Sequence, residues 1–228
     1  MIIKFKSVCH ARLESVGKVV VSPLSLAKLE NVFLLSFLVW PGCSGSYSER
    51  VAAPTWDPVS MANKAISEFD KNGDSKLSEE ELSSAPGLKY CSKQLDSEGD
   101  GDGSLNSEEI ASRISQYVKM RVGLTPFDCK ILLNKRPLVG AKVRLIPESF
   151  LVEALDSLEG TSNEGGLVQF TPEDINMSVV PPGMYRVEVT SSELEIPEEY
   201  NVKTTLGVEV SSIPDSYHEG QVTFFLKR

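Results

Sequence analysis

Residues 70–81 read DKNGDSKLSEEE, a short acidic segment in which oxygen-bearing side chains recur before a closing glutamate. A hard divalent cation takes roughly six to eight oxygen ligands, and this spacing can supply most of them from one loop. Apolar residues one turn apart precede the segment, as expected of an entering helix. The expected ligands are Asp70, Asn72, Asp74, the backbone carbonyl of Lys76, Ser78 and Glu81.

This segment resembles the loop of an EF-hand, a helix-loop-helix element that binds calcium. One position departs from the family's pattern, because Ser75 stands where a glycine is usual for the sharp turn. We expect Ser75 to take a positive φ at a cost of roughly 1 kcal/mol. The departure therefore predicts weaker calcium binding at this loop and not its loss.

A second acidic segment, DSEGDGDGSLNSEE, occupies residues 96–109 and is less regular. Its closing end matches the first loop, with Glu109 as the last ligand. Two residues could supply the first ligand of this loop. Asp96 follows directly after the apolar residues of the entering helix, whereas Glu98 is the first residue of a loop of regular length that ends at Glu109. A degenerate loop that pairs with the first without binding calcium is the alternative. The other expected ligands are Asp100, Asp102, Ser104 and Asn106.

From about residue 125 the pattern changes to short β-branched runs separated by Gly, Pro and Asn turns. The segments NKRPLVGAKVRLIPE (134–148), GTSNEGGLVQF (160–170) and PPGMYRVEVT (181–190) resemble pieces of carboxypeptidase-regulatory or transthyretin-like domains. Asn163 replaces the aspartate usual in the second piece. The resemblance implies a seven-stranded Greek-key β-sandwich, and it implies neither hormone binding nor catalysis.

The expected fold class is therefore α plus all-β in two domains, an EF-hand helix-loop-helix pair followed by a seven-stranded Greek-key (transthyretin-like) β-sandwich. Leu77 and Leu105 should form a short β-bridge between the two loops. The expected boundaries are a leader at 1–42, a tether at 43–57, the EF-hand pair at 58–122 and the sandwich at 123–228.

The N-terminal region predicts export. Residues 1–42 hold five Lys or Arg against two Asp or Glu, in a chain of net charge −9. The apolar run VFLLSFLVW at 32–40 is shorter than the about 20 residues of a membrane-spanning helix, and it matches the apolar core of a signal peptide. A secretory segment without lipid, or a buried segment of a larger fold, are the alternatives.

The apolar run is followed by Pro41 and the pair Gly42-Cys43, and so resembles a bacterial lipoprotein signal. Trp40 and Pro41 depart from the smaller residues usual in that family. The resemblance implies cleavage before Cys43, lipidation of its thiol, a membrane anchor and a location in the cell envelope. The block IPEEYNVKTTLG at residues 196–207 is similar in arrangement to that of planctomycete-type exported lipoproteins that carry the sandwich domain.

The cysteines Cys9, Cys43, Cys91 and Cys129 show no C-x-x-C spacing, so a zinc or redox site is not expected. Cleavage and lipidation would leave Cys91 and Cys129. These two could form a disulfide in an exported protein, or remain as two buried thiols.

The acidic charge argues against a nucleic-acid partner, which needs clustered Lys and Arg. Nucleophile-elbow, zinc-protease and phosphate-loop motifs are absent from the sequence, so we do not expect an enzyme. The only histidines are His10, in the expected leader, and His218, in a loop.

The function expected from these features is a calcium-binding cell-envelope lipoprotein. Calcium would order the loop pair as a structural element beside an adhesive or scaffolding sandwich with an unidentified protein partner. One alternative is a calcium-dependent interaction module, similar in logic to dockerins, which also use paired calcium loops. Another is a transthyretin-like binder of a small ligand.

Overall fold

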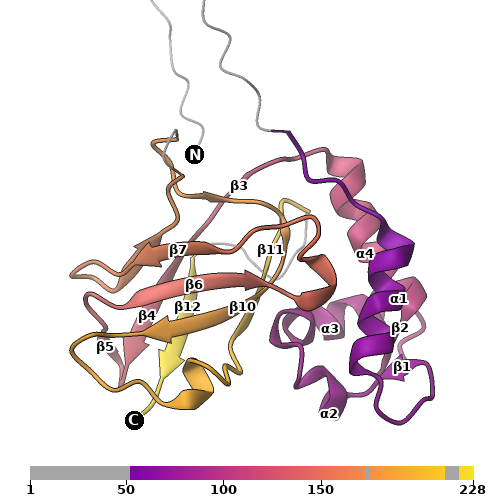
Figure 1. Ribbon diagram of the computed structural model, residues 1–228, viewed down its shortest axis with the longest axis horizontal. Helices are drawn as coiled ribbons and strands as arrows, with labels where there is room; N and C mark the ends of the chain where they lie inside the picture. The colour runs from indigo at the N-terminus through magenta and orange to yellow at the C-terminus, as the bar shows by residue number, and fades with distance from the viewer. Residues whose placement is uncertain (1–51, 173–174, 214–220) are drawn as a thin grey trace, which may run out of the picture. The chain divides into compact units, whose positions relative to one another are not determined.

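In the computed structural model the α-helices come first, with two two-residue strands between them, and the remaining strands follow (Figure 1). The structure describes residues 52–172, 175–213 and 221–228, which belong to a compact unit of residues 48–228. Outside the described residues lie the expected leader at 1–42, Cys43, residues 43–51 of the expected tether, His10 and His218.

Three of the four α-helices in the described residues begin with a capping side chain that accepts a hydrogen bond from a first-turn N–H group. Asp57 accepts a hydrogen bond from the Ser60 N–H (3.1 Å), and Pro58 fills the first helical position. None of the helices in the described ranges is long and apolar enough to cross a membrane. The helices are α1 (Pro58–Phe69), α2 (Glu79–Leu82), α3 (Pro86–Glu98) and α4 (Ser107–Met120), with the short 3₁₀ turns η1 (Ser149–Leu151) and η2 (Glu198–Tyr200).

The strands are short and fall into several small sheets. Two-residue strands form β1 with β2 and β3 with β9, while β6 and β10 share the longest antiparallel pairing. The strands are β1 (Lys76–Leu77), β2 (Leu105–Asn106), β3 (Thr125–Pro126), β4 (Asp128–Leu133), β5 (Arg136–Pro137), β6 (Lys142–Pro147), β7 (Leu158–Thr161), β8 (Leu167–Gln169), β9 (Val179–Val180), β10 (Gly183–Thr190), β11 (Gly207–Val210) and β12 (Val222–Leu226).

The larger sheets have the orders β11-β10-β6-β7 and β12-β4-β5, and β8 pairs with β4. β12 runs parallel to β4, with Val222 opposite Cys129 and Leu226 opposite Leu133. Alternating residues of β10 and β6, such as Val187 and Val143, face the core and are fully buried.

The expected fold class is wrong, because a two-domain layout of an EF-hand pair and a separate Greek-key sandwich is not formed. Buried side chains from helices and strands belong to one hydrophobic cluster, which extends from Met61 on α1 to Leu226 on β12. α3 packs directly against β10 and β11 (Figure 1). The physical reason is size, since a helical segment of this length has a marginal core of its own and buries its apolar faces against the strands.

The backbone at the start of α3 lies close to the backbone of β10. Gly87 lies so near β10 that a Cβ atom there would be 2.7 Å from the Tyr185 nitrogen. Its N–H donates to the buried carboxylate of Glu148 (2.6 Å), which caps α3 in place of a local side chain. The sheets thus hold the helix that leads into the second acidic loop.

Candidate metal centre

The first loop follows α1 and is organised by the carboxylate of Asp70. Its two oxygens accept hydrogen bonds from the N–H groups of Gly73 (2.6 Å) and Ser75 (2.9 Å). Asn72 and Asp74 each accept from an N–H group two residues further on, at 2.8 and 2.9 Å. These local contacts turn the chain around the side-chain oxygens, because short polar side chains bond readily to nearby backbone N–H groups.

Ser75 has a φ of +66°, as its place in the loop predicts, and Gly73 has a φ of +80°. A left-handed conformation costs a residue with a Cβ atom roughly 1 kcal/mol more than it costs glycine. The contact of the Ser75 N–H with Asp70 helps to hold this conformation. The first loop therefore forms with serine in place of glycine at position 75, and carries strain there.

Glu81 closes the first loop and caps the helix that follows. One oxygen accepts from the Lys71 N–H (2.8 Å), and the other accepts from the Ser78 N–H (2.9 Å) and hydroxyl (2.7 Å). The Ser78 hydroxyl, followed by the Ser78 and Lys71 N–H groups, lowers the pKa of Glu81 to about 2. Glu81 is therefore an anion throughout the physiological pH range.

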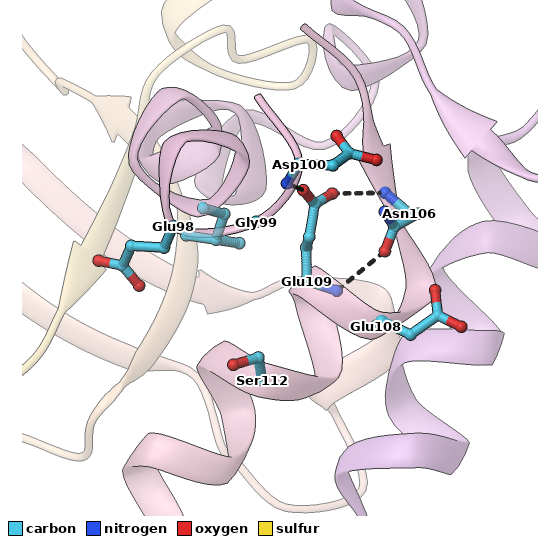
Figure 2. A pocket seen from close by; sticks show the side chains of 8 residues that line it. Glu98, Gly99, Asp100, Asn106, Glu108, Glu109 and Ser112 are labelled. Carbon is cyan, nitrogen blue, oxygen red and sulfur yellow. Dashed lines mark hydrogen bonds between the residues drawn. The ribbon is translucent and has the colours of Figure 1, made fainter. Parts of the chain in front are cut away.

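The second loop repeats this design over a longer span. Asp96, in the last turn of α3, accepts a hydrogen bond from the Gly103 N–H (3.0 Å), as Asp70 does from Ser75. Glu109 accepts from the Asp100 N–H (3.1 Å) and the Asn106 N–H (2.9 Å), and these contacts are drawn in Figure 2. The loop therefore runs from Asp96 to Glu109, with α3 continuing into its first residues.

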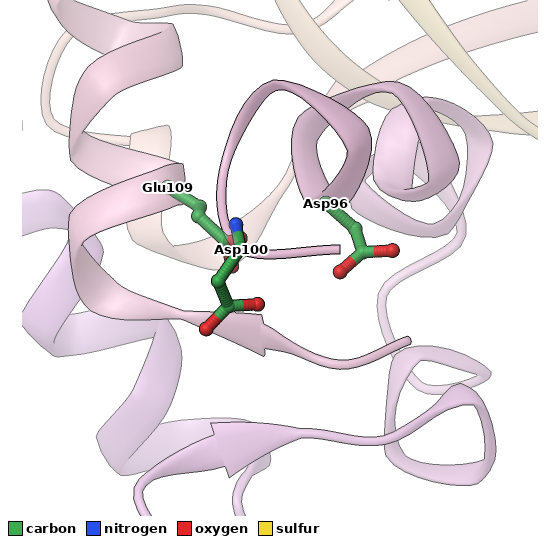
Figure 3. A group of neighbouring side chains, drawn as sticks. All are labelled: Asp96, Asp100 and Glu109. Carbon is green, nitrogen blue, oxygen red and sulfur yellow. The ribbon is translucent and has the colours of Figure 1, made fainter. Parts of the chain in front are cut away.

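Three carboxylates meet in the second loop. Oxygens of Asp96, Asp100 and Glu109 all lie within 4.8 Å of one another (Figure 3). Asp100 is exposed, Asp96 is half-buried, and Glu109 is only 7% exposed. Within the described part of the chain such a group of three is found here and not in the first loop.

Glu98, the other candidate for first ligand, lies apart from this group. Its carboxylate accepts from the side-chain amides of Gln94 (2.8 Å) and Gln116 (3.4 Å), and it is 3.9 Å from Arg113. Figure 2 shows it directed away from Asp100 and Glu109. Of the two candidates, Asp96 lies beside Asp100 and Glu109, and Glu98 does not.

Of the remaining candidates, Asp102 contacts a residue of the first loop. Asp102 accepts from the Ser104 N–H (3.0 Å), and its other oxygen bonds to the ammonium group of Lys76. The Lys76 nitrogen also lies 3.4 Å from an oxygen of Asp100. The loop pattern assigns a ligand role only to the backbone carbonyl of Lys76, so these side-chain contacts were not expected. Its side-chain role could have been found from the expected bridge, which places this lysine beside the acidic second loop.

The two loops are joined by β1 and β2, which pair Leu77 with Leu105 and Lys76 with Asn106. Leu77 and Leu105 are buried, so the predicted bridge between the loops is confirmed. A pocket of about 420 Å³ opens beside the second loop (Figure 2). It is lined by Leu95, Glu98, Gly99, Asp100, Asn106, Glu108, Glu109 and Ser112.

The two cysteines in the described residues, Cys91 and Cys129, are free and buried. Burial raises the pKa of the Cys129 thiol to about 12 and that of Cys91 above its ordinary range. Of the two alternatives from the sequence, a disulfide and a pair of buried thiols, the structure has the buried thiols.

Comparisons of the chain with protein-family models, with curated proteins and with solved structures found no match. The likeness of the two loops to EF-hands therefore rests on their own residues and geometry.

Proposed function

We propose that this chain binds calcium in its paired acidic loops, and that calcium acts there as a structural element. The observation that carries the proposal is the meeting of Asp96, Asp100 and Glu109 within 4.8 Å. Carboxylates so close repel one another when ionised, and a divalent cation between them replaces repulsion by attraction. The burial of Glu109 strengthens this effect, because water screens a buried charge poorly.

The ligand set favours calcium over softer metals, since the candidate atoms are oxygens of carboxylates, amides, hydroxyls and the backbone. In the first loop the candidate ligand atoms belong to the six residues named from the sequence, and the Asp70 carboxylate organises the backbone of this loop. The strained Ser75 and the irregular second loop favour weak binding, with dissociation constants of roughly 10⁻⁴–10⁻³ M. Affinity in this range suits constant occupancy where calcium is abundant.

Calcium bound only by the folded state would add about 2.7 kcal/mol to the free energy of unfolding at a hundredfold excess over the dissociation constant. The hydrophobic cluster that helices and strands share passes this stabilisation to the whole unit. The proposed role is therefore to fix the loops and the helices against the sheets.

Thermal unfolding in calcium, in magnesium and in chelator tests this function. We expect calcium to raise the melting temperature by about 5–10 °C over chelator at a hundredfold excess. Glu109→Gln should lose part of that gain, whereas Glu108→Gln, at the exposed neighbouring position, makes the same charge change and should keep it. Identical melting in calcium and chelator would contradict the proposal.

We also propose export and lipidation at Cys43, supported by the apolar run at 32–40 and the Gly42-Cys43 pair. Such a location would expose the loops to extracytoplasmic calcium. Mass spectrometry of the mature N-terminus tests this directly. A lipid-modified Cys43 is the expected result, and a mature chain that retains residues 1–42 without lipid would overturn it.

A further inference from the structure

Lys76 connects the two acidic loops by its charge as well as by its backbone. Its position on β1, opposite Asn106 on β2, directs its side chain toward the second loop. There the ammonium group bonds to the carboxylate of Asp102 and lies 3.4 Å from an oxygen of Asp100. A residue of the first loop thus contacts two candidate ligands of the second.

The contact between Lys76 and Asp102 is charge-assisted, because an ammonium group donates a hydrogen bond to a carboxylate. The side chains of Lys76 and Asp102 are 37% and 40% exposed. Among ion pairs between described residues, none involves Asp70, Asp74 or Glu81 of the first loop.

We infer that Lys76 is an internal cation that competes with calcium for the second loop. Its ammonium group donates hydrogen bonds to the oxygens that a metal ion would need, and its charge repels a divalent ion. Calcium must displace the lysine from Asp102 and Asp100 before it can gather them with Asp96 and Glu109. The first loop therefore fills first, and the second fills at higher calcium concentration. This inference rests on the proposed calcium binding.

The expected magnitude follows from Coulomb's law. The lysine side chain is about one-third exposed, so water screens its charge substantially. A unit charge within several ångströms of a divalent ion in such a medium changes the ion's affinity by about tenfold. Removing the charge should therefore tighten the weaker site by about that factor.

Calcium titration calorimetry of the whole chain tests the inference with three variants. Lys76→Met removes the charge and keeps the length of the side chain and the backbone carbonyl. Lys76→Arg keeps a cation at the same place. Lys89→Met makes the same change of net charge at a lysine that bonds instead to Ser83 (2.9 Å) and lies near Glu79. Circular dichroism of each variant checks that the fold is kept.

We expect Lys76→Met to bind its weaker calcium about tenfold more tightly, or to gain a second bound calcium if the wild type shows only one. Lys76→Arg and Lys89→Met should stay within about twofold of the wild type. If Lys76→Met matches Lys89→Met while the wild type binds calcium, the inference fails and the proposed function stands. If neither the wild type nor Lys76→Met takes up calcium, both are wrong.

Discussion

Arg113 on α4 and Glu209 on β11 form a buried, bidentate ion pair. Their atoms meet at 2.6 Å (Nε to Oε1) and 2.8 Å (Nη2 to Oε2), with side chains 1% and 0% exposed. The Tyr117 hydroxyl donates to the same carboxylate. Arg113 lies one turn beyond Glu109 along α4, so this pair ties the helix that leaves the second acidic loop to the edge of a sheet.

Arg113→Met should lower the free energy of unfolding by about 3–5 kcal/mol, because it leaves the Glu209 charge buried without its partner. The double variant Arg113→Met with Glu209→Met should cost less than this single change, since no buried charge remains. Urea unfolding followed by circular dichroism measures both. Lys142→Met is the control, because it breaks a surface pair with Glu159 (2.8 Å) and should cost less than about 1 kcal/mol. Equal losses for the buried and surface pairs would contradict the assignment.

Glu148 makes stability depend on pH. Burial is the main cause that raises its pKa from 4.5 to about 7, against the lowering effect of the Gly87 N–H. Since the folded state holds this proton more tightly than the unfolded state, the contribution of Glu148 is fully present below pH 4.5. It is lost as the pH rises through 7, and amounts to about 3 kcal/mol.

Denaturant unfolding between pH 4.5 and 8, in chelator, checks this dependence. Glu148→Gln keeps an acceptor for the Gly87 N–H and cannot ionise, so its stability should fall less over this range than that of the wild type. At pH 8 it should be at least as stable as the wild type. Parallel curves for the two proteins would show that Glu148 does not titrate in this range.

The positive φ angles of Gly73 and Ser75 predict that substitutions at these two turn positions have different effects on stability. Gly73→Ala places a Cβ at a φ of +80° with no atom within 4 Å of it, so its cost of about 1 kcal/mol is purely conformational. Ser75→Gly removes the same kind of strain and should leave stability equal or slightly higher, because added freedom of the unfolded chain offsets the gain. Thermal unfolding in chelator measures both. A large loss from Ser75→Gly would contradict the account of the turn.

Asp96 and Glu98 should differ as calcium ligands. Asp96→Asn should weaken the second site by about tenfold or more, because it removes a charge that faces Asp100 and Glu109. Glu98→Gln makes the same charge change at a carboxylate bonded to Gln94 and should alter affinity by less than about threefold. Calorimetric titration of both variants decides between them, and a stronger effect at Glu98 would reverse the assignment.

The features that the sequence predicts well are local. Asp70 and Ser75 are five residues apart, and their contact follows from loop spacing alone. The bridge between Leu77 and Leu105 was also predictable, because each leucine holds the same place in its loop. The choice between Asp96 and Glu98 was not, since it depends on how far α3 continues.

The predicted fold class was wrong because the fold depends on contacts between residues that are distant in the sequence. The pairing of β12 with β4 and the ion pair of Arg113 with Glu209 leave no mark in local periodicity. The loop pattern assigns a role only to the backbone carbonyl of Lys76, so it does not predict the contact of the Lys76 side chain with Asp102.

The central claim is that the paired loops bind calcium, and titration calorimetry of the wild-type chain, first freed of metal by chelator, tests it most directly. We predict saturable uptake of one calcium ion per loop, with dissociation constants of roughly 10⁻⁴–10⁻³ M and a weaker second loop. Absence of both heat and any shift in thermal unfolding at about 10 mM calcium, well above that range, would contradict the claim.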